Sequence, residues 1–171
     1  MDYIGNYASW IKQEYIDFML NNPGTPRPGG GRNPDSEEFR KAKEHGYDLS
    51  QTYWYIYEPD TFPFNMSLPF EINNGIDSLW WGIKMNPGNF MPIHRDPHTQ
   101  DPSIYDCKRY WMALQDWEPG HIFMYEKQTL VDYKKGDIYC YPDSQAIHCA
   151  CNIGNSTRLT FHFSTYYNKH G

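Results

Sequence analysis

The sequence predicts a mainly β fold of the sandwich, barrel or jelly-roll type, preceded by a part that is helical and rich in loops. The first observation is a change of pattern at Gly46: apolar residues recur every three or four positions before it, whereas Tyr, Trp, Ile and Thr dominate after it. The second is a series of turn signals that divide the later part into short segments, at the ~8–12-residue spacing of an all-β domain. The third is the composition, in which 15 Tyr, 9 Phe and 6 Trp offer large rings for a core.

Chain length and aromatic content together favour one folded domain. A length of 171 residues fits a single domain, 1–171, with 1–79 as a helical and loop-rich support and 80–166 as the β-rich core. Only 30 residues are Leu, Ile, Val or Phe, a fraction that can indicate disorder when the net charge is high. The net charge is only −6, however, and the Tyr, Trp and Met residues compensate for the missing aliphatic side chains.

The charge and the distribution of apolar residues exclude several classes of protein. Basic residues number 15 and acidic residues 21, and no basic cluster exceeds two residues, so nucleic acid is not an expected partner. No window approaches the ~18 uninterrupted apolar residues of a transmembrane helix, so no membrane association is expected. The N-terminus lacks the basic and apolar regions of a signal peptide, which favours a cytoplasmic location. The oligomeric state is left open.

Two helices and a long loop are expected before the strands. Apolar residues spaced by three and four predict the first helix over Ser9–Asn21, and a Pro-Gly pair ends it. The stretch 23–34 holds four Pro and four Gly and is expected to be a loop, either a mobile surface loop or a lid over an active site. A capping-type start at Asp35 begins a second helix, which ends at Gly46.

Nine short strands are expected in the later part of the chain. Each candidate is rich in Tyr, Trp, Ile, Thr or Phe, the residues that favour strands, and turn signals containing Gly, Pro or Asn separate them. Their number and spacing indicate a sandwich, a barrel or a jelly roll. The candidates are Gln51–Tyr57, Ser78–Met85, Asn89–His94, Lys108–Asp116, His121–Glu126, Thr129–Tyr133, Asp137–Tyr141, Ala146–Cys151 and Thr157–Tyr166.

The four cysteines are expected to be free, mostly structural thiols. They are Cys107, Cys140, Cys149 and Cys151, and their spacing does not match a CxxC zinc site. A reducing compartment would keep them as thiols.

The triplet His94-Arg95-Asp96 is the sharpest local feature of the sequence. Residues at i and i+2 project from the same face of a strand, so one imidazole and one carboxylate can bind the same metal ion. Alone, the triplet is equally readable as a surface His and Asp just beyond a strand. A second histidine, His148, lies on a later predicted strand. Two histidines and one carboxylate form a facial triad that leaves three positions open on an octahedral iron(II).

Arg158 is expected to stand beside His148. If Cys151 and Asn155 flank a three-residue hairpin loop centred on Ile153, His148 and Arg158 are directly opposed and share a face of the sheet. The planar fork of Arg suits a carboxylate, so the pair would serve a small dicarboxylic acid that also chelates the metal. A loop of two or four residues would break this opposition, and Arg158 would then be an ordinary exposed strand residue.

The order of these residues resembles the iron(II)/2-oxoglutarate-dependent dioxygenase superfamily. That superfamily has HxD, then a distal His about fifty residues later, then Arg ten residues on. The stretches that carry the resemblance are Met91-Pro-Ile-His-Arg-Asp-Pro97, Gly136-Asp-Ile-Tyr-Cys-Tyr-Pro-Asp143, Ala146-Ile-His148 and Thr157-Arg-Leu-Thr-Phe-His-Phe163. They are most similar to the aspartyl/asparaginyl β-hydroxylase-like branch, with the prolyl hydroxylase-like branch as a further relative. Some aspartyl hydroxylases lack the carboxylate ligand, which Asp96 supplies here.

The resemblance covers about Trp80–Tyr166 and implies a fold and a ligand set. The implied fold is a double-stranded β-helix, a cupin-like form of jelly roll, with the N-terminal helices as its support. The implied metal ligands are His94, Asp96 and His148. Arg158 would bind the C5 carboxylate of 2-oxoglutarate.

Further residues are assigned to the site by the same resemblance. Arg109 would help to hold the co-substrate, although neighbouring residues are equally placeable. His98 and Tyr110 are candidates for side chains that contact the site without binding the metal. His121 and His162 are expected to be packed or solvent-facing strand residues.

The activity implied by the resemblance is hydroxylation of a C–H bond with release of succinate and CO2. Its cofactors would be Fe(II), 2-oxoglutarate and O2, with ascorbate as a candidate reductant. The expected substrate is a peptide or protein side chain, or a free amino acid or other small molecule. Two alternatives stay open. One is another metal-dependent cupin enzyme, whose site commonly uses additional His or Glu ligands. The other is a non-catalytic, aromatic-rich β-sandwich binding module.

Overall fold

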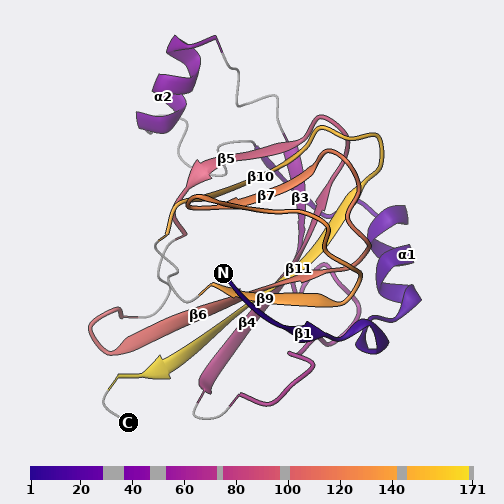
Figure 1. Cartoon of the computed structure of the whole chain (residues 1–171), viewed down its shortest axis with the longest axis vertical. Helices are drawn as coiled ribbons and strands as arrows, with labels where there is room; N and C mark the ends of the chain where they lie inside the picture. Colours follow the sequence, from indigo (N-terminus) through magenta and orange to yellow (C-terminus); the bar gives the residue numbers. More distant parts are fainter. Residues whose placement is uncertain (29–36, 47–52, 73–74, 97–100, 142–145, 170–171) are drawn as a thin grey trace.

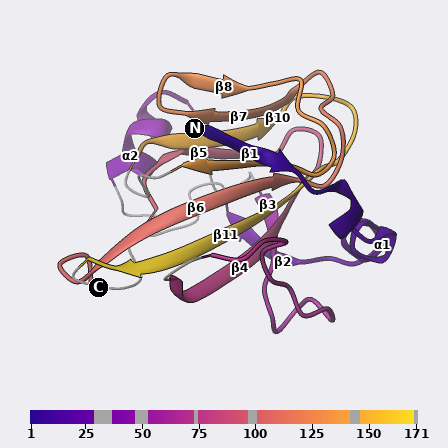
Figure 2. The ribbon, with the colours of Figure 1, turned by 60° about the horizontal axis from the view of Figure 1, so that its bottom comes forward.

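Two antiparallel sheets lie one above the other in the computed structural model, which describes residues 1–28, 37–46, 53–72, 75–96, 101–141 and 146–169 (Figures 1 and 2). The large sheet has the strand order β1-β9-β6-β11-β4-β3-β2, and the small sheet has the order β5-β10-β7-β8. The strands of the large sheet are β1 (Asp2–Asn6), β9 (Asp137–Tyr141), β6 (Tyr105–Ala113), β11 (Arg158–Asn168), β4 (Gly75–Met85), β3 (Tyr53–Tyr57) and β2 (Thr25–Pro28). Those of the small sheet are β5 (Phe90–His94), β10 (His148–Asn152), β7 (His121–Tyr125) and β8 (Gln128–Leu130).

The chain winds between the two sheets from β4 onward. It passes from β4 in the large sheet to β5 in the small one, returns to β6, goes to β7 and β8, returns to β9, and crosses once more through β10 to β11. Two antiparallel sheets connected in this way form a jelly roll, here a double-stranded β-helix. The predicted fold class is therefore confirmed, and all nine strands predicted after Gly46 are present, each end within three residues of its expected position.

The strict alternation of side chains along β11 separates two hydrophobic cores. Leu159, Phe161 and Phe163 point to the outer face of the large sheet and pack with Met19 of helix α1 (Gln13–Asn21). The intervening residues face the small sheet, where a second core fills the space between the sheets. That inner core comprises Trp54, Ile83, Met85, Trp111, Ala113, Phe123, Tyr125, Leu130, Tyr133, Tyr141, Ala146 and Ala150. Rings therefore supply most of the bulk in both cores, as the composition predicts.

The N-terminal part differs from the prediction in three places. Strand β1 was not expected, and it pairs with β9. The first helix is divided into a 3-10 turn, η1 (Ala8–Trp10), and α1. The expected loop 23–34 begins with β2, which pairs with β3; because β2 is at the edge of the sheet, its prolines remove no ladder hydrogen bond that a neighbour needs.

The remaining N-terminal elements agree more closely with expectation. Helix α2 (Glu37–Glu44) lies within the predicted second helix, and Gly46 beyond its end has a φ of +85°, the left-handed value typical of a helix C-terminus. Residues 29–36 lie outside the described part of the chain, so both readings of the expected loop, as a mobile surface loop or as a lid, stay predictions for those positions. Within the described helices, none has the length and apolar character needed to cross a membrane.

Candidate metal centre and its surroundings

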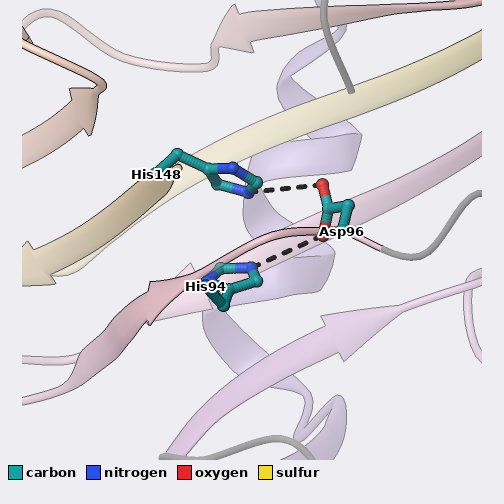
Figure 3. A group of neighbouring side chains, drawn as sticks. All are labelled: His94, Asp96 and His148. Atoms are coloured by element: carbon teal, nitrogen blue, oxygen red, sulfur yellow. Dashed lines mark ion pairs between the residues drawn. The ribbon is translucent and has the colours of Figure 1, made fainter. Parts of the chain in front are cut away.

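His94, Asp96 and His148 meet between the two sheets (Figure 3). His94 ends β5, Asp96 follows two residues later, and His148 begins β10, where it is the register partner of His94. One ligand atom from each residue lies within 4.8 Å of the others. His94 Nε2 is 3.4 Å from Asp96 Oδ1, and His148 Nε2 is 3.2 Å from Asp96 Oδ2. The structure thus brings together the three residues predicted as metal ligands.

Both histidines are oriented by backbone carbonyls. Nδ1 of His94 lies 2.8 Å from the carbonyl oxygen of Pro92, and Nδ1 of His148 lies 3.0 Å from that of Ala146. A carbonyl oxygen only accepts, so each Nδ1 carries a proton, and each Nε2 is directed at the shared centre. Metal-binding histidines are commonly fixed in this way. The donor set of two imidazoles and one carboxylate therefore fits a divalent transition metal.

Arg109 holds the carboxylate of the triad from the large sheet. Its Nη1 lies 3.0 Å from Asp96 Oδ2, and its side chain is only 5% exposed. The guanidinium also lies over the ring of Trp81, 5.4 Å from the centroid. Burial raises the pKa of Asp96, but hydrogen bonds from His148 and His94 and the charge of Arg109 outweigh burial and hold that pKa well below its usual range. Asp96 is therefore an anion over the working range of pH.

The hairpin expected between His148 and Arg158 is wrong. Strand β10 lies in the small sheet and β11 in the large one, so the two residues belong to different sheets, and Arg158 is paired with Met85 of β4. The connection crosses between the sheets because Asn152 anchors it: its Nδ2 donates to the carbonyl oxygens of Met85, at 2.8 Å, and Ser156, at 2.7 Å. Arg158 nevertheless lies on the inner face of β11.

Arg158 is buried, and no acidic side chain among the described residues forms an ion pair with it. It is 1% exposed, and its guanidinium carbon lies 5.7 Å from the centroid of the Trp111 ring. Nη1 contacts the sulfur of Met85 at 3.3 Å, and the guanidinium also interacts with the hydroxyl of Tyr133. Burial lowers the pKa of Arg158, but an Arg guanidinium stays charged in proteins. Such a charge is costly in the interior unless a partner neutralises it.

His162 is a residue of the inner face that sequence reasoning left among packed strand residues. It stacks on Trp81 with a centroid distance of 5.6 Å and an interplanar angle of 16°, and its Nε2 lies 3.2 Å from Oγ1 of Thr160. Burial, followed by the charge of Arg158, lowers the pKa of His162 well below its ordinary value, so the imidazole is neutral. The sequence does contain a signal for this position: His162 follows Arg158 by four residues on one strand, so both side chains point to the same face of the sheet.

The other residues assigned to the site lie elsewhere or outside the described chain. Tyr110 is on the opposite face of β6 from Arg109, in the outer core, with its hydroxyl 3.2 Å from that of Tyr167. His98 falls in 97–100, which the structure does not describe. His121 is fully buried, and its Nε2 lies 3.2 Å from the carbonyl oxygen of Ser156. All four cysteines are free thiols, as predicted.

Comparisons with known proteins give distant similarities of structure only. No family model and no curated protein matches the sequence. A predicted oxalate decarboxylase from Thermotoga maritima is 18% identical over 51% of this chain and 64% of that one, with a TM-score of 0.38. The cupin domain of Cnp3 from Schizosaccharomyces pombe is 14% identical over 70% and 72% of the two chains, with a TM-score of 0.43. KdgF from Halomonas sp. is 13% identical over 55% and 73%, with a TM-score of 0.39. This chain thus spans less than two thirds of the first structure, and the fold assignment rests on the strand order given above.

Proposed function

We propose that the protein is an Fe(II)- and 2-oxoglutarate-dependent dioxygenase that hydroxylates a C–H bond and releases succinate and CO2. The observation that carries the proposal is Arg158, which is buried on the inner face of the large sheet with no acidic partner among the described residues, while His94, Asp96 and His148 meet between the same two sheets. A metal centre alone would be compatible with many enzymes. A metal centre with a separate buried cation suits a co-substrate that chelates at one end and carries a carboxylate at the other.

The register of the large sheet sets Arg158 apart from the metal centre. Arg109, which contacts Asp96, pairs with Ser164 of β11, so Arg158 lies six residues from that point along the same strand. The Arg158 guanidinium lies over the ring of Trp111, two residues from Arg109 on β6. This position would suit the far carboxylate of a co-substrate that chelates the metal at its other end.

The roles of the protein groups follow from their positions. His94, Asp96 and His148 would hold Fe(II) and leave open positions for the co-substrate and O2, and the bound metal would supply the oxidative chemistry. Arg158 would orient the co-substrate through charge-assisted hydrogen bonds, each worth about 1.5–3 kcal/mol. The rings of the inner core exclude water from the space between the sheets.

A peptidyl or free amino-acid side chain is the substrate class we propose, on the resemblance to the aspartyl/asparaginyl β-hydroxylase-like branch. Ascorbate would serve as a reductant, and the proposed location is the cytoplasm. The alternative of another metal-dependent cupin enzyme fits less well, because the His/Cys/Asp/Glu group at this centre has three members within the described chain. An enzyme of that kind commonly uses an additional His or Glu ligand.

The test is succinate formation from 2-oxoglutarate by the iron-loaded protein, alone and with a panel of peptides and amino acids searched for a mass increase of one oxygen atom. His94→Ala, Asp96→Ala and His148→Ala should each abolish turnover and weaken metal binding. Arg158→Ala should raise the KM for 2-oxoglutarate by about 100-fold, the loss expected for two charge-assisted hydrogen bonds, and leave metal affinity unchanged. Turnover that survives in all three ligand variants would overturn the metal assignment, and an unchanged KM in Arg158→Ala would overturn the co-substrate assignment.

A further inference from the structure

A row of aromatic rings leads from the metal centre to the edge of the large sheet. The ring of His148 lies 6.1 Å from that of Phe123, and Phe123 is stacked on Trp111 at 5.8 Å, both measured between ring centroids. The contacts continue from Trp111 to Tyr139 at 6.0 Å and from Tyr139 to Tyr3 at 5.3 Å. These last three residues are register partners on β6, β9 and β1, which lie side by side (Figure 1). Phe is harder to oxidise than Trp or Tyr, so Phe123 is a bridge in this row and the other three rings are its oxidisable members.

The two ends of the oxidisable row differ in exposure and in polar partners. Trp111 is 0% exposed, and its Nε1 makes no hydrogen bond within the described residues. Tyr3 is 57% exposed, and its hydroxyl donates to Oδ1 of Asp137 at 3.2 Å. The carboxylate of Asp137 is itself fixed by the backbone N–H of Lys134, at 2.7 Å, and by Nδ2 of Asn6, at 2.9 Å. A base is therefore in place for the phenolic proton at the outer end of the row, whereas none among the described residues serves the indole at the inner end.

Charges beside the row favour movement of an oxidised state toward the surface. The guanidinium of Arg158 lies over the Trp111 ring at 5.7 Å, and a positive charge there disfavours the cation radical that Trp111 becomes when it loses an electron. The carboxylate of Asp137 at the other end has the opposite effect on Tyr3. An electron lost from Trp111 is thus replaced from Tyr139 and finally from Tyr3.

We propose that Trp111, Tyr139 and Tyr3 carry single electrons from the surface to the metal centre, so that an oxidant formed there from O2 or peroxide without a substrate is reduced before it attacks the interior. With Fe(II) and hydrogen peroxide, the O–O bond breaks and peroxide takes two electrons, one from Fe(II), which becomes Fe(III), and one from Tyr3. The O–H bond of Tyr3 breaks and its proton passes to Asp137, while peroxide leaves as two water molecules with two protons from solvent. A soluble reductant such as ascorbate then restores Tyr3 with one electron and one proton.

The path rests on the metal centre of the proposed function, but it does not need turnover of 2-oxoglutarate. Tyr139→Phe tests it, because the variant keeps the ring and removes the oxidisable phenol between Trp111 and Tyr3. Tyr3 stays exposed in this variant, so its oxidation from bulk solution would continue. Tyr55→Phe is the matched control, since Tyr55 is also a half-buried strand tyrosine of the large sheet but packs against the outer core, away from the row.

The experiment mixes the whole chain, loaded with Fe(II), with an equal amount of hydrogen peroxide and a nitroso spin trap, and maps the products by mass spectrometry of the digested protein. Wild type and Tyr55→Phe should carry the trap on Tyr3. Tyr139→Phe should lose this adduct and gain an oxygen atom on Trp111 instead, with thermal unfolding showing that its fold is kept.

Three results would overturn the path. They are an adduct on Tyr3 that persists in Tyr139→Phe, an adduct that forms equally in EDTA or in His148→Ala, and a wild type without the adduct. The first two would mean that Tyr3 is oxidised from solution. If the adduct depends on Tyr139 and on the metal but the iron-loaded protein does not turn over 2-oxoglutarate, the path stands and the proposed dioxygenase activity fails.

Discussion

The carboxylate of Asp96 is contacted by side chains from three different strands. His94 comes from β5, His148 from β10 and Arg109 from β6, and each places a nitrogen within 3.4 Å of one of the two carboxylate oxygens. Both carboxylate oxygens are therefore in contact with nitrogen atoms. A metal ion that enters the centre would replace the contacts from the histidines, whereas the contact from Arg109 can persist. Arg109 is thus a positioning residue for the carboxylate ligand.

Arg109→Met should weaken metal binding while the fold is kept. Met approximates the length of the Arg stem but cannot donate to Asp96, and loss of a hydrogen bond that orients a metal ligand typically costs about 10- to 100-fold in metal affinity. The measurement is titration with Mn(II). Lys108→Met is the control, because Lys108 is exposed on the opposite face of the same strand, over the ring of Tyr167. Equal losses in both variants would argue against a specific role for Arg109.

At the scale of elements, adjacent side chains of β4 point to opposite faces of the large sheet. Ile83 and Met85 enter the inner core, and Lys84 between them points to the outer face, where it meets the end of α1. Its ammonium group donates to the carbonyl oxygens of Met19, at 2.7 Å, and Leu20, at 3.0 Å. A cation at this point satisfies carbonyls that a helix C-terminus leaves unpaired, and it complements the helix dipole.

Lys84→Met should destabilise the protein by about 1–3 kcal/mol, because the last carbonyls of α1 then lose a charged donor in a largely buried setting. Urea unfolding measures the change. Lys134→Met, at an exposed turn position with a 70% exposed side chain, should change stability by less than about 0.5 kcal/mol. Because Lys84 faces away from the metal centre, affinity for Mn(II) should be the same in both variants. A Lys84→Met protein as stable as Lys134→Met would show that the contact with α1 contributes little.

At the scale of the whole molecule, the sequence predicts what is local and misses what depends on the path between sheets. His94 and Asp96 are predictable because side chains two residues apart along an extended chain project to the same side, whatever the strand before them pairs with. The position of Arg158 relative to His148 is not predictable, because the same alternation of residues suits a hairpin and a crossover between sheets. The crossover is held by hydrogen bonds from Asn152 to the carbonyl oxygens of Met85 and Ser156. Strand β2 was missed since its prolines are tolerated only at a sheet edge, which the sequence does not reveal.

The three proposed ligands come from segments that are far apart in the sequence, so metal binding should stabilise the molecule as a whole. His94 and Asp96 flank the end of β5, and His148 begins β10, more than fifty residues later. Unfolding separates them, so a metal binds only the folded state. At a concentration 100 times the Kd this adds about 2.7 kcal/mol, which for a chain of this size raises the melting temperature by about 5–11 °C.

Thermal unfolding with excess Mn(II) and with EDTA measures this shift, which should shrink at lower pH because protons compete for the two imidazoles. His148→Ala should lose the shift. His45→Ala, which removes an exposed histidine beyond α2, should keep all of it. A shift that survives in His148→Ala would place the bound metal at another site, and its absence in the wild type would mean that these three side chains, although assembled, bind Mn(II) too weakly to act as a metal centre.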